Sequence, residues 1–292
     1  MELVDLHVHS TASDGSFAPA AVVRLAREGG LKAIALTDHD TIDGLPEALQ
    51  AGQELDVEVI PGVEISAAFS GESMHILGYF LDYRSGRLDE RLAVLKQARA
   101  ARNPKIIARL NARGIPVTME QVERLSGGGQ VGRPHIARAL FDGGYVRTIQ
   151  EAFDIYLRHG GLAYVAKFRF QPEEAIDMIR EVGGVPVLAH PFTLGVNSPR
   201  ALTNLLKELR DKGLAGIEVF YADHTPEQET LYLKLGRELG LLITGGSDFH
   251  GLNKPEVSLG AFRSQVKLTY VLVTALKAWR EKQYGIGGGA EG

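Results

Sequence analysis

The stretch Leu3-Val4-Asp5-Leu6-His7-Val8-His9 is an apolar run that ends in a His-x-His pair. Side chains alternate along a strand, so His7 and His9 share one face and can chelate a single ion. Taken alone, the pair is equally consistent with two hydrogen-bonded polar side chains. Four later apolar runs end in a similar way, in Thr37-Asp38-His39-Asp40, Gly62-Val63-Glu64, Ala189-His190-Pro191 and Ser247-Asp248-Phe249-His250. Imidazoles and carboxylates at so many strand ends indicate a site for divalent metal ions.

Strand-like and helix-like runs alternate along most of the chain, and several of the helix-like runs stop at glycine. The expected strands are Leu3–Val8, Ala33–Leu36, Val57–Ile60, Ile76–Phe80, Val185–Leu188, Gly216–Phe220 and Leu241–Thr244. The expected helices between them include Ala18–Glu28, Pro172–Glu181, Arg200–Lys212 and Pro226–Leu239. This alternation is typical of parallel βα units in an α/β fold. Periodicity does not separate a barrel from an open sheet, but a barrel brings all the strand ends to one mouth and is therefore favoured.

Residues 85–165 interrupt the alternation, because this stretch is mostly helical and contains the glycine-rich segment Ser126–Gly132. We therefore expect a barrel built from residues 1–84 and 166–292, with residues 85–165 inserted as a small helical lid.

A basic run lies inside the insertion. From Arg91 to Arg113 the chain has seven basic residues and no acidic one. This pattern predicts either a solvated helix face or a cationic cap for a phosphate. The dipeptide Asn103-Pro104 reads as a helix N-cap and first helical position, so we expect one helix to end and another to start there. Such a start would direct backbone N–H groups at an anion.

The composition narrows the possible function classes. The chain has no cysteine, which excludes disulfides, thiolate metal sites and a cysteine nucleophile. Its net charge of −4 gives no overall attraction to nucleic acid or to an anionic membrane. No run approaches the ~18 apolar residues of a membrane span, and the first residues lack the pattern of a signal peptide. The expectation is a cytoplasmic protein without a membrane association or an obligate protein partner.

Two further candidate ligands complete a recognisable set: Asp14, in Ser13-Asp14-Gly15, and His75, near the start of the fourth strand. The ordered motifs Asp-x-His-x-His-Ser, Ser-Asp-Gly, Thr-Asp-His-Asp, Pro-Gly-x-Glu, Ala-His-Pro and Gly-Ser-Asp-x-His resemble those of the PHP (polymerase and histidinol phosphatase) family. The resemblance covers residues 1 to about 85 and 165 to 255. It implies a distorted (β/α)7, TIM-like barrel with up to three metal ions.

The resemblance also implies how the ligands are shared among the ions. The first ion would be held by His7, His9, Glu64 and Asp248, the second by Glu64, His75 and His190, and the third by Asp14, His39 and His250. A competent ligand fills every position of the pattern, which argues against a metal-stabilised accessory domain without turnover. Manganese is the expected metal, although imidazoles and carboxylates also accept Zn²⁺ or Fe²⁺.

The chemistry expected of this set is metal-assisted hydrolysis of a phosphate ester. A metal ion lowers the pKa of bound water from ~15.7 toward ~7, so the water becomes a hydroxide nucleophile at neutral pH. We assign the catalytic role to Asp14, His39, Glu64 and His250. Asp38 and Asp40 flank His39, and each is expected to be either an orienting carboxylate or a turn or helix-cap residue.

Substrate-binding residues are expected on the lid and beside it. The basic run offers Arg99, Arg102 and Asn103, and the motif Gly132-Arg133-Pro134-His135 offers a phosphate-binding Arg133 and a proton-donating His135. Lys167 and Asp223 are further candidates. The alternatives are a surface arginine and a helix-start histidine for the motif, and a loop and helix cap around Asp223.

The inserted lid resembles the branch of the family that contains nucleoside 3′,5′-bisphosphate phosphatases and 5′→3′ exoribonucleases. We therefore expect a phosphoric monoester hydrolase that converts a nucleoside 3′,5′-bisphosphate to the 5′-monophosphate and phosphate. The alternatives are a 5′→3′ exonuclease on short RNA and a histidinol-phosphate phosphatase. In each case the expected partner is a small phosphorylated substrate. It is a nucleotide for the bisphosphate phosphatase and a short RNA for the exonuclease.

Overall fold

A computed structural model of the chain describes residues 1–70, 72–196, 198–261 and 266–285. Seven strands form one sheet whose spatial order follows the sequence. They are β1 (Leu3–Val8), β2 (Leu31–Leu36), β3 (Glu58–Phe69), β4 (Glu72–Tyr79), β5 (Val185–Leu188), β6 (Gly216–Tyr221) and β7 (Leu242–Gly246). Strands β1, β2 and β3 pair in parallel, and so do β5, β6 and β7.

The two edges of the sheet meet just beyond β7. Asp248 N donates to His7 O at 2.8 Å, and His9 N donates to Phe249 O at 3.0 Å. The buried Asp5 carboxylate reinforces this seam, since it accepts hydrogen bonds from Ser247 N and Ser247 Oγ. The sheet is therefore a nearly closed seven-stranded barrel, which confirms the predicted α/β barrel.

Strand β4 departs from the expected parallel arrangement, because it is antiparallel to both β3 and β5. The chain turns back at once between Phe69 and Glu72, whereas a parallel crossover needs a dozen or more residues. As a result, the N-terminal part of β4 lies at the mouth, and His75 pairs with Ser66 of β3. Strand β3 also runs beyond the predicted end at Ile60. Gly62 permits this because a Cβ there would lie only 2.8 Å from Thr37 Cγ2.

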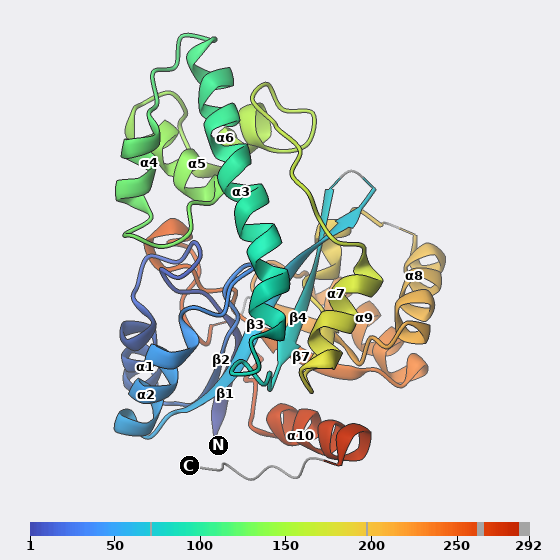
Figure 1. Ribbon diagram of the computed structural model, residues 1–292. Helices are drawn as coiled ribbons and strands as arrows, with labels where there is room; N and C mark the ends of the chain where they lie inside the picture. Colours follow the sequence, from blue (N-terminus) through green and yellow to red (C-terminus); the bar gives the residue numbers. More distant parts are fainter. Residues whose placement is uncertain (71, 197, 262–265, 286–292) are drawn as a thin grey trace.

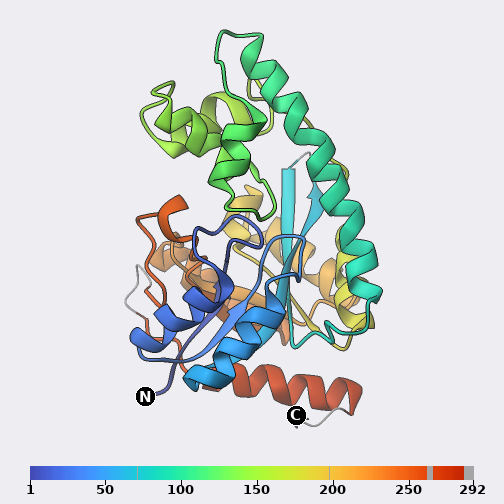
Figure 2. The same ribbon diagram turned by 60° about the vertical axis from the view of Figure 1, so that its left-hand side comes forward.

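Helices cover the barrel and close its far end. They are α1 (Pro19–Glu28), α2 (Leu45–Leu55), α7 (Pro172–Glu181), α8 (Pro199–Asp211), α9 (Pro226–Leu239) and α10 (Val271–Tyr284), with short 3₁₀ turns at Pro191–Leu194 and Gly251–Asn253. Val273 and Leu276 of α10 join the apolar cluster inside the barrel, beside Leu6 and Leu77. Figures 1 and 2 show α10 lying across the end of the barrel opposite the lid.

The lid is helical, as predicted. It contains α3 (Arg87–Asn111), α4 (Met119–Leu125), α5 (Arg133–Asp142), α6 (Ile149–Ala152) and a π-helical turn (Phe153–Leu157). These elements enclose a small apolar core drawn from residues 106–163. Figure 1 shows the lid above the end of the barrel that α10 leaves open.

The predicted helix break at Asn103-Pro104 is wrong, because α3 continues through Pro104. Leu92 and Leu95, before the proline, are buried in the barrel cluster, and Ile106 and Leu110, after it, are buried in the lid core. Burial at both ends offsets the ~3 kcal/mol that an internal proline costs a helix. One continuous helix therefore connects the barrel to the lid, and the domain boundary at residue 85 stays a prediction.

None of the described helices is long and apolar enough to cross a membrane.

Candidate metal centre

Glu64 lies at the middle of the mouth, fully buried, with five imidazoles around its carboxylate. Its Oε2 lies 3.0 Å from His7 Nε2, 3.1 Å from His9 Nε2 and 3.2 Å from His39 Nδ1. Its Oε1 lies 2.8 Å from His75 Nδ1 and 2.9 Å from His190 Nε2. Each oxygen thus serves a different subset of ligands, which is the arrangement that a bridging carboxylate requires.

Among the described residues, donor atoms gather in three groups, each with its ligand atoms within 4.8 Å of one another. The groups are His7, His9, Glu64 and Asp248; His9, Asp14, His39 and His250; and His39, Glu64 and His75. His190 Nε2 lies 3.4 Å from His75 Nδ1 and belongs beside the last group. The structure brings all nine expected ligands together, including His75, which was expected to begin or precede the fourth strand and lies within β4.

Two of the candidate ligands and the nearby Asp40 have strained backbone conformations just after strands. His190 has φ +24°, Asp248 has φ +57° and Asp40 has φ +55°. Non-glycine residues in this region cost about 1–3 kcal/mol each, and such strain concentrates at functional sites. The surrounding hydrogen bonds therefore hold each of these residues in place after its strand.

Glu218 of β6 is a site residue that the sequence analysis missed. Its Oε1 lies 3.0 Å from His7 Nδ1, and its Oε2 accepts a hydrogen bond from His190 N at 2.7 Å. A carboxylate behind a ligand imidazole fixes the tautomer and makes the imidazole a better donor to a metal. The available signal was an acidic residue within the buried strand Gly216–Tyr221.

Further supports come from residues flanking the ligands. Tyr221 Oη donates to Asp248 Oδ2 at 2.8 Å. Asp38 accepts hydrogen bonds from Ser10 N and from the Ser10 and Ser13 hydroxyls, so it organises the loop that carries Asp14.

The electrostatics of the cluster suit cations. Burial raises the pKa of Glu64, but the positive charge of the adjacent His7 opposes burial, and the pKa of Glu64 lies well below its usual range. Burial lowers the pKa of His39 to about 3, so this imidazole is neutral and able to coordinate. The buried atoms His9 Nε2 and His39 Nδ1 make no hydrogen bond although Glu64 lies close to both. Ionised carboxylates beside unsatisfied imidazole nitrogens fit divalent ions.

A cavity of about 230 Å³, which we call the metal-facing cavity, is lined by candidate ligands such as His75 and His250 and also by the cations Arg99, Arg102 and Lys167. The buried Asp40 carboxylate binds both Lys167 Nζ, at 2.8 Å, and Arg99 Nη2. Arg102 is 4% exposed, and its guanidinium donates to Asn103 Oδ1. No carboxylate of the described residues lies within 4 Å of that guanidinium. The metal-facing cavity is therefore lined both by candidate metal ligands and by buried cations.

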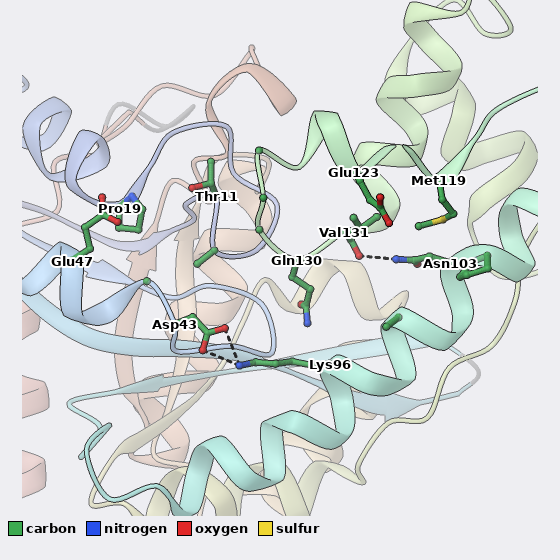
Figure 3. Close-up of a pocket in the computed structure, with 17 residues that line it drawn as sticks. Thr11, Pro19, Asp43, Glu47, Lys96, Asn103, Met119, Glu123, Gln130 and Val131 are labelled. Carbon is green, nitrogen blue, oxygen red and sulfur yellow. Dashed lines mark hydrogen bonds and ion pairs between the residues drawn. The ribbon is translucent and has the colours of Figure 1, made fainter. Parts of the chain in front are cut away.

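The remaining expected contacts occupy different positions. Asn103 does not line this cavity; its Nδ2 donates to Val131 O at 2.8 Å, and it borders a separate cavity of about 770 Å³ beside Lys96 (Figure 3). Arg133 lines the metal-facing cavity and donates to Leu157 O. His135 accepts from Gly132 N and caps α5, with its Nε2 buried and unpaired.

Asp223 also lies away from the metal-facing cavity, paired with Lys254 Nζ at 3.1 Å. Neither Asn103 nor Asp223 therefore faces the cluster, and their role as substrate contacts stays a prediction.

The purified protein is expected to contain two or three divalent ions per chain, because its ligand atoms form three overlapping groups. Removing them with a chelator should abolish hydrolysis, and adding Mn²⁺ should restore it. Elemental analysis of the active protein checks the stoichiometry. One ion per chain at full activity would contradict a multinuclear centre.

Comparisons with known proteins agree with this geometry. Residues 5–183 match the PHP domain family model. The chain is 36% identical to the 5′-3′ exoribonuclease Rnm of Salmonella typhimurium, over 85% of each chain. It is 31% identical to a 3′,5′-nucleoside bisphosphate phosphatase of Chromobacterium violaceum, over 86% of this chain and 88% of the relative.

A solved structure described as a metal-dependent phosphoesterase, from Bifidobacterium adolescentis, superimposes with a TM-score of 0.83 at 30% identity and covers 95% of this chain and 96% of its own. The family match spans more than half of this chain, and both curated relatives align along most of their length. The chain therefore belongs to the PHP family and is a metal-dependent phosphoesterase.

Proposed function

We propose that this phosphoesterase removes the 3′-phosphate of a nucleoside 3′,5′-bisphosphate and leaves the 5′-monophosphate. Arg102 carries the proposal. Burying a charge costs several kcal/mol unless a counter-charge compensates it, and this guanidinium has no carboxylate partner in the described chain. It faces the same cavity as the metal ligands. A second phosphate of the substrate would supply the missing counter-charge.

The residues divide the work between the two phosphates. Arg99, Arg102 and Lys167 would bind the 5′-phosphate and so hold the 3′-phosphate over Glu64 and its imidazoles. Ions in the cluster would supply an acidified water molecule and would neutralise charge on the reacting phosphoryl group. Histidinol phosphate, with one phosphate, would leave the cationic side without an anion and is disfavoured for that reason.

A second candidate is 5′→3′ exonuclease activity on short RNA. The similarity to the Salmonella relative supports it. Both reactions would break the bond between phosphorus and O3′, and in both the enzyme would bind a 5′-phosphate of the substrate. Measuring product release with Mn²⁺ from nucleoside 3′,5′-bisphosphates, 3′-monophosphates, histidinol phosphate and short RNAs tests the proposal. It fails if the 5′-phosphate gives no advantage over the 3′-monophosphate.

Lys167 gives the proposal a pH signature. Burial lowers the pKa of Lys167 to about 7, although Asp40 opposes the change. The ammonium is therefore charged below pH 7 and loses its charge above it. The ratio of kcat/KM for the bisphosphate to kcat/KM for the 3′-monophosphate should fall about 5-fold between pH 7 and pH 8. The permanently charged Lys167→Arg variant should remove this fall, whereas an unchanged slope in that variant would show that another group is responsible.

A further inference from the structure

The lid touches the barrel at a loop that carries one of the candidate metal ligands. This loop, which we call the Asp14 loop, consists of residues 10–15 and lies between β1 and α1. Asp14 belongs to the group of donor atoms that also contains His9, His39 and His250, and its Oδ1 lies 3.1 Å from His250 Nε2. A displacement of the Asp14 loop would therefore remove a ligand from this group.

On the barrel side, hydrogen bonds hold the Asp14 loop in place. Ser13 N donates to Ser10 O at 3.1 Å. The hydroxyls of Ser10 and Ser13 both donate to the buried Asp38 carboxylate, at 2.7 Å and 2.6 Å. The barrel thus anchors the loop on either side of Thr11 and Ala12, and these two residues meet the lid.

On the lid side, the glycine-rich segment (residues 126–132) lies directly against the Asp14 loop. Gln130 N donates to Ala12 O at 3.4 Å. A Cβ at Gly129 would collide with Thr11 O and would lie 2.7 Å from Thr11 C, so a side chain there requires the two backbones to separate. Figure 3 shows Thr11 beside the part of the segment that leads to Gln130.

The contact, and not the local conformation, demands glycine at position 129. Gly127 and Gly128 have φ of +62° and +92°, the region that favours glycine, but the backbone of Gly129 lies outside this region. A Cβ at Gly128 would meet none of the described residues within 4 Å, apart from its chain neighbours. The two neighbouring glycines are therefore needed for different reasons, Gly128 for its backbone and Gly129 for the approach to Thr11.

We propose that Gly129 is a positioning residue for the metal centre, because its contact with Thr11 lets the lid hold the Asp14 loop in place. The same segment also reaches the carboxylate itself, since a Cβ at Gly132 would lie 3.5 Å from Asp14 Oδ2. The centre thus depends on the lid as well as on the barrel. Binding couplings are reciprocal, so an ion bound by Asp14 and His250 should in turn hold the glycine-rich segment on the barrel.

The first test compares Gly129→Ala with Gly128→Ala, which adds the same methyl group to the same segment without a contact to the barrel. The loaded protein is dialysed against a series of Mn²⁺ concentrations, and the bound ions are counted. Gly129→Ala should weaken the binding of one ion about 10- to 100-fold, the usual effect of losing the support of a metal ligand. Excess Mn²⁺ should restore the full ion count, which an unfolded protein would not show. Gly128→Ala should bind Mn²⁺ as the unmodified protein does.

The second test uses the unmodified protein, so it holds even if Gly129→Ala does not fold. Hydrogen exchange is measured at the highest and the lowest of these Mn²⁺ concentrations. The backbone amides of residues 127–131 should exchange more slowly when the ions are bound, whereas those of residues 158–162, elsewhere in the lid, should not change.

Three results would overturn the inference. Equal losses of Mn²⁺ affinity in both variants would assign the effect to the conformation of the segment and not to the contact with Thr11. Unchanged Mn²⁺ affinity in a folded Gly129→Ala would show that the contact does not support the centre. Exchange of residues 127–131 that does not respond to Mn²⁺ would show that the lid and the ions are not coupled.

Discussion

Replacing Glu64 by glutamine is expected to lower kcat by more than about 100-fold, because changes behind the ligands alone cost about 10–100-fold. The substitution preserves the size of the side chain but removes its charge and introduces a donor. Five imidazoles lie within 3.2 Å of the carboxylate oxygens, so an amide cannot accept from all of them. Loss of the shared anion should also release metal. The measurement is kcat for phosphate release together with the metal content of the same sample.

The matched control is Glu28→Gln, at the exposed end of α1, which makes the same chemical change far from the mouth. A melting temperature close to that of the unmodified protein would show that Glu64→Gln still folds, since the site and the barrel core are separate clusters of side chains. A near-normal rate with full metal content would remove Glu64 from the centre.

The gathering of the candidate metal ligands could be predicted because most of them lie at or just after the expected end of an apolar strand, and strand ends of a barrel meet at one mouth. The residues His7, Glu64 and Asp248 are adjacent in space for this reason, although they are distant in sequence. The direction of β4 was not accessible in the same way. A short apolar run has the same pattern in a parallel or an antiparallel strand. The direction of β4 follows from the connection of two residues between Phe69 of β3 and Glu72 of β4, which is too short for a parallel crossover.

The supporting residues were harder to predict than the ligands. Glu218 carries no motif, and its role comes from the strand register that places it behind His7. Asp40 was expected to be either an orienting carboxylate for His39 or a turn or helix-cap residue, yet it binds Arg99 and Lys167 from two other segments of the chain. Such contacts depend on how the lid is seated on the barrel. In the same way, the basic run could be recognised as unusual, but the sequence alone could not show which of its cations are buried.

Arg102→Ala is expected to raise KM for a nucleoside 3′,5′-bisphosphate about 10- to 100-fold, since a hydrogen bond to a charged group contributes about 1.5–3 kcal/mol. For a 3′-monophosphate the increase should be much smaller, because the reacting phosphate lies over the metals in both substrates. Burial and the nearby Arg99 lower the pKa of Arg102 to about 8, so this guanidinium gains most from an anionic partner. Lys105→Ala, an exposed cation on the same helix, controls for the overall charge of α3. Equal increases in KM for both substrates would show that Arg102 acts only by general electrostatic attraction. A larger increase for the bisphosphate would locate the second phosphate beside α3.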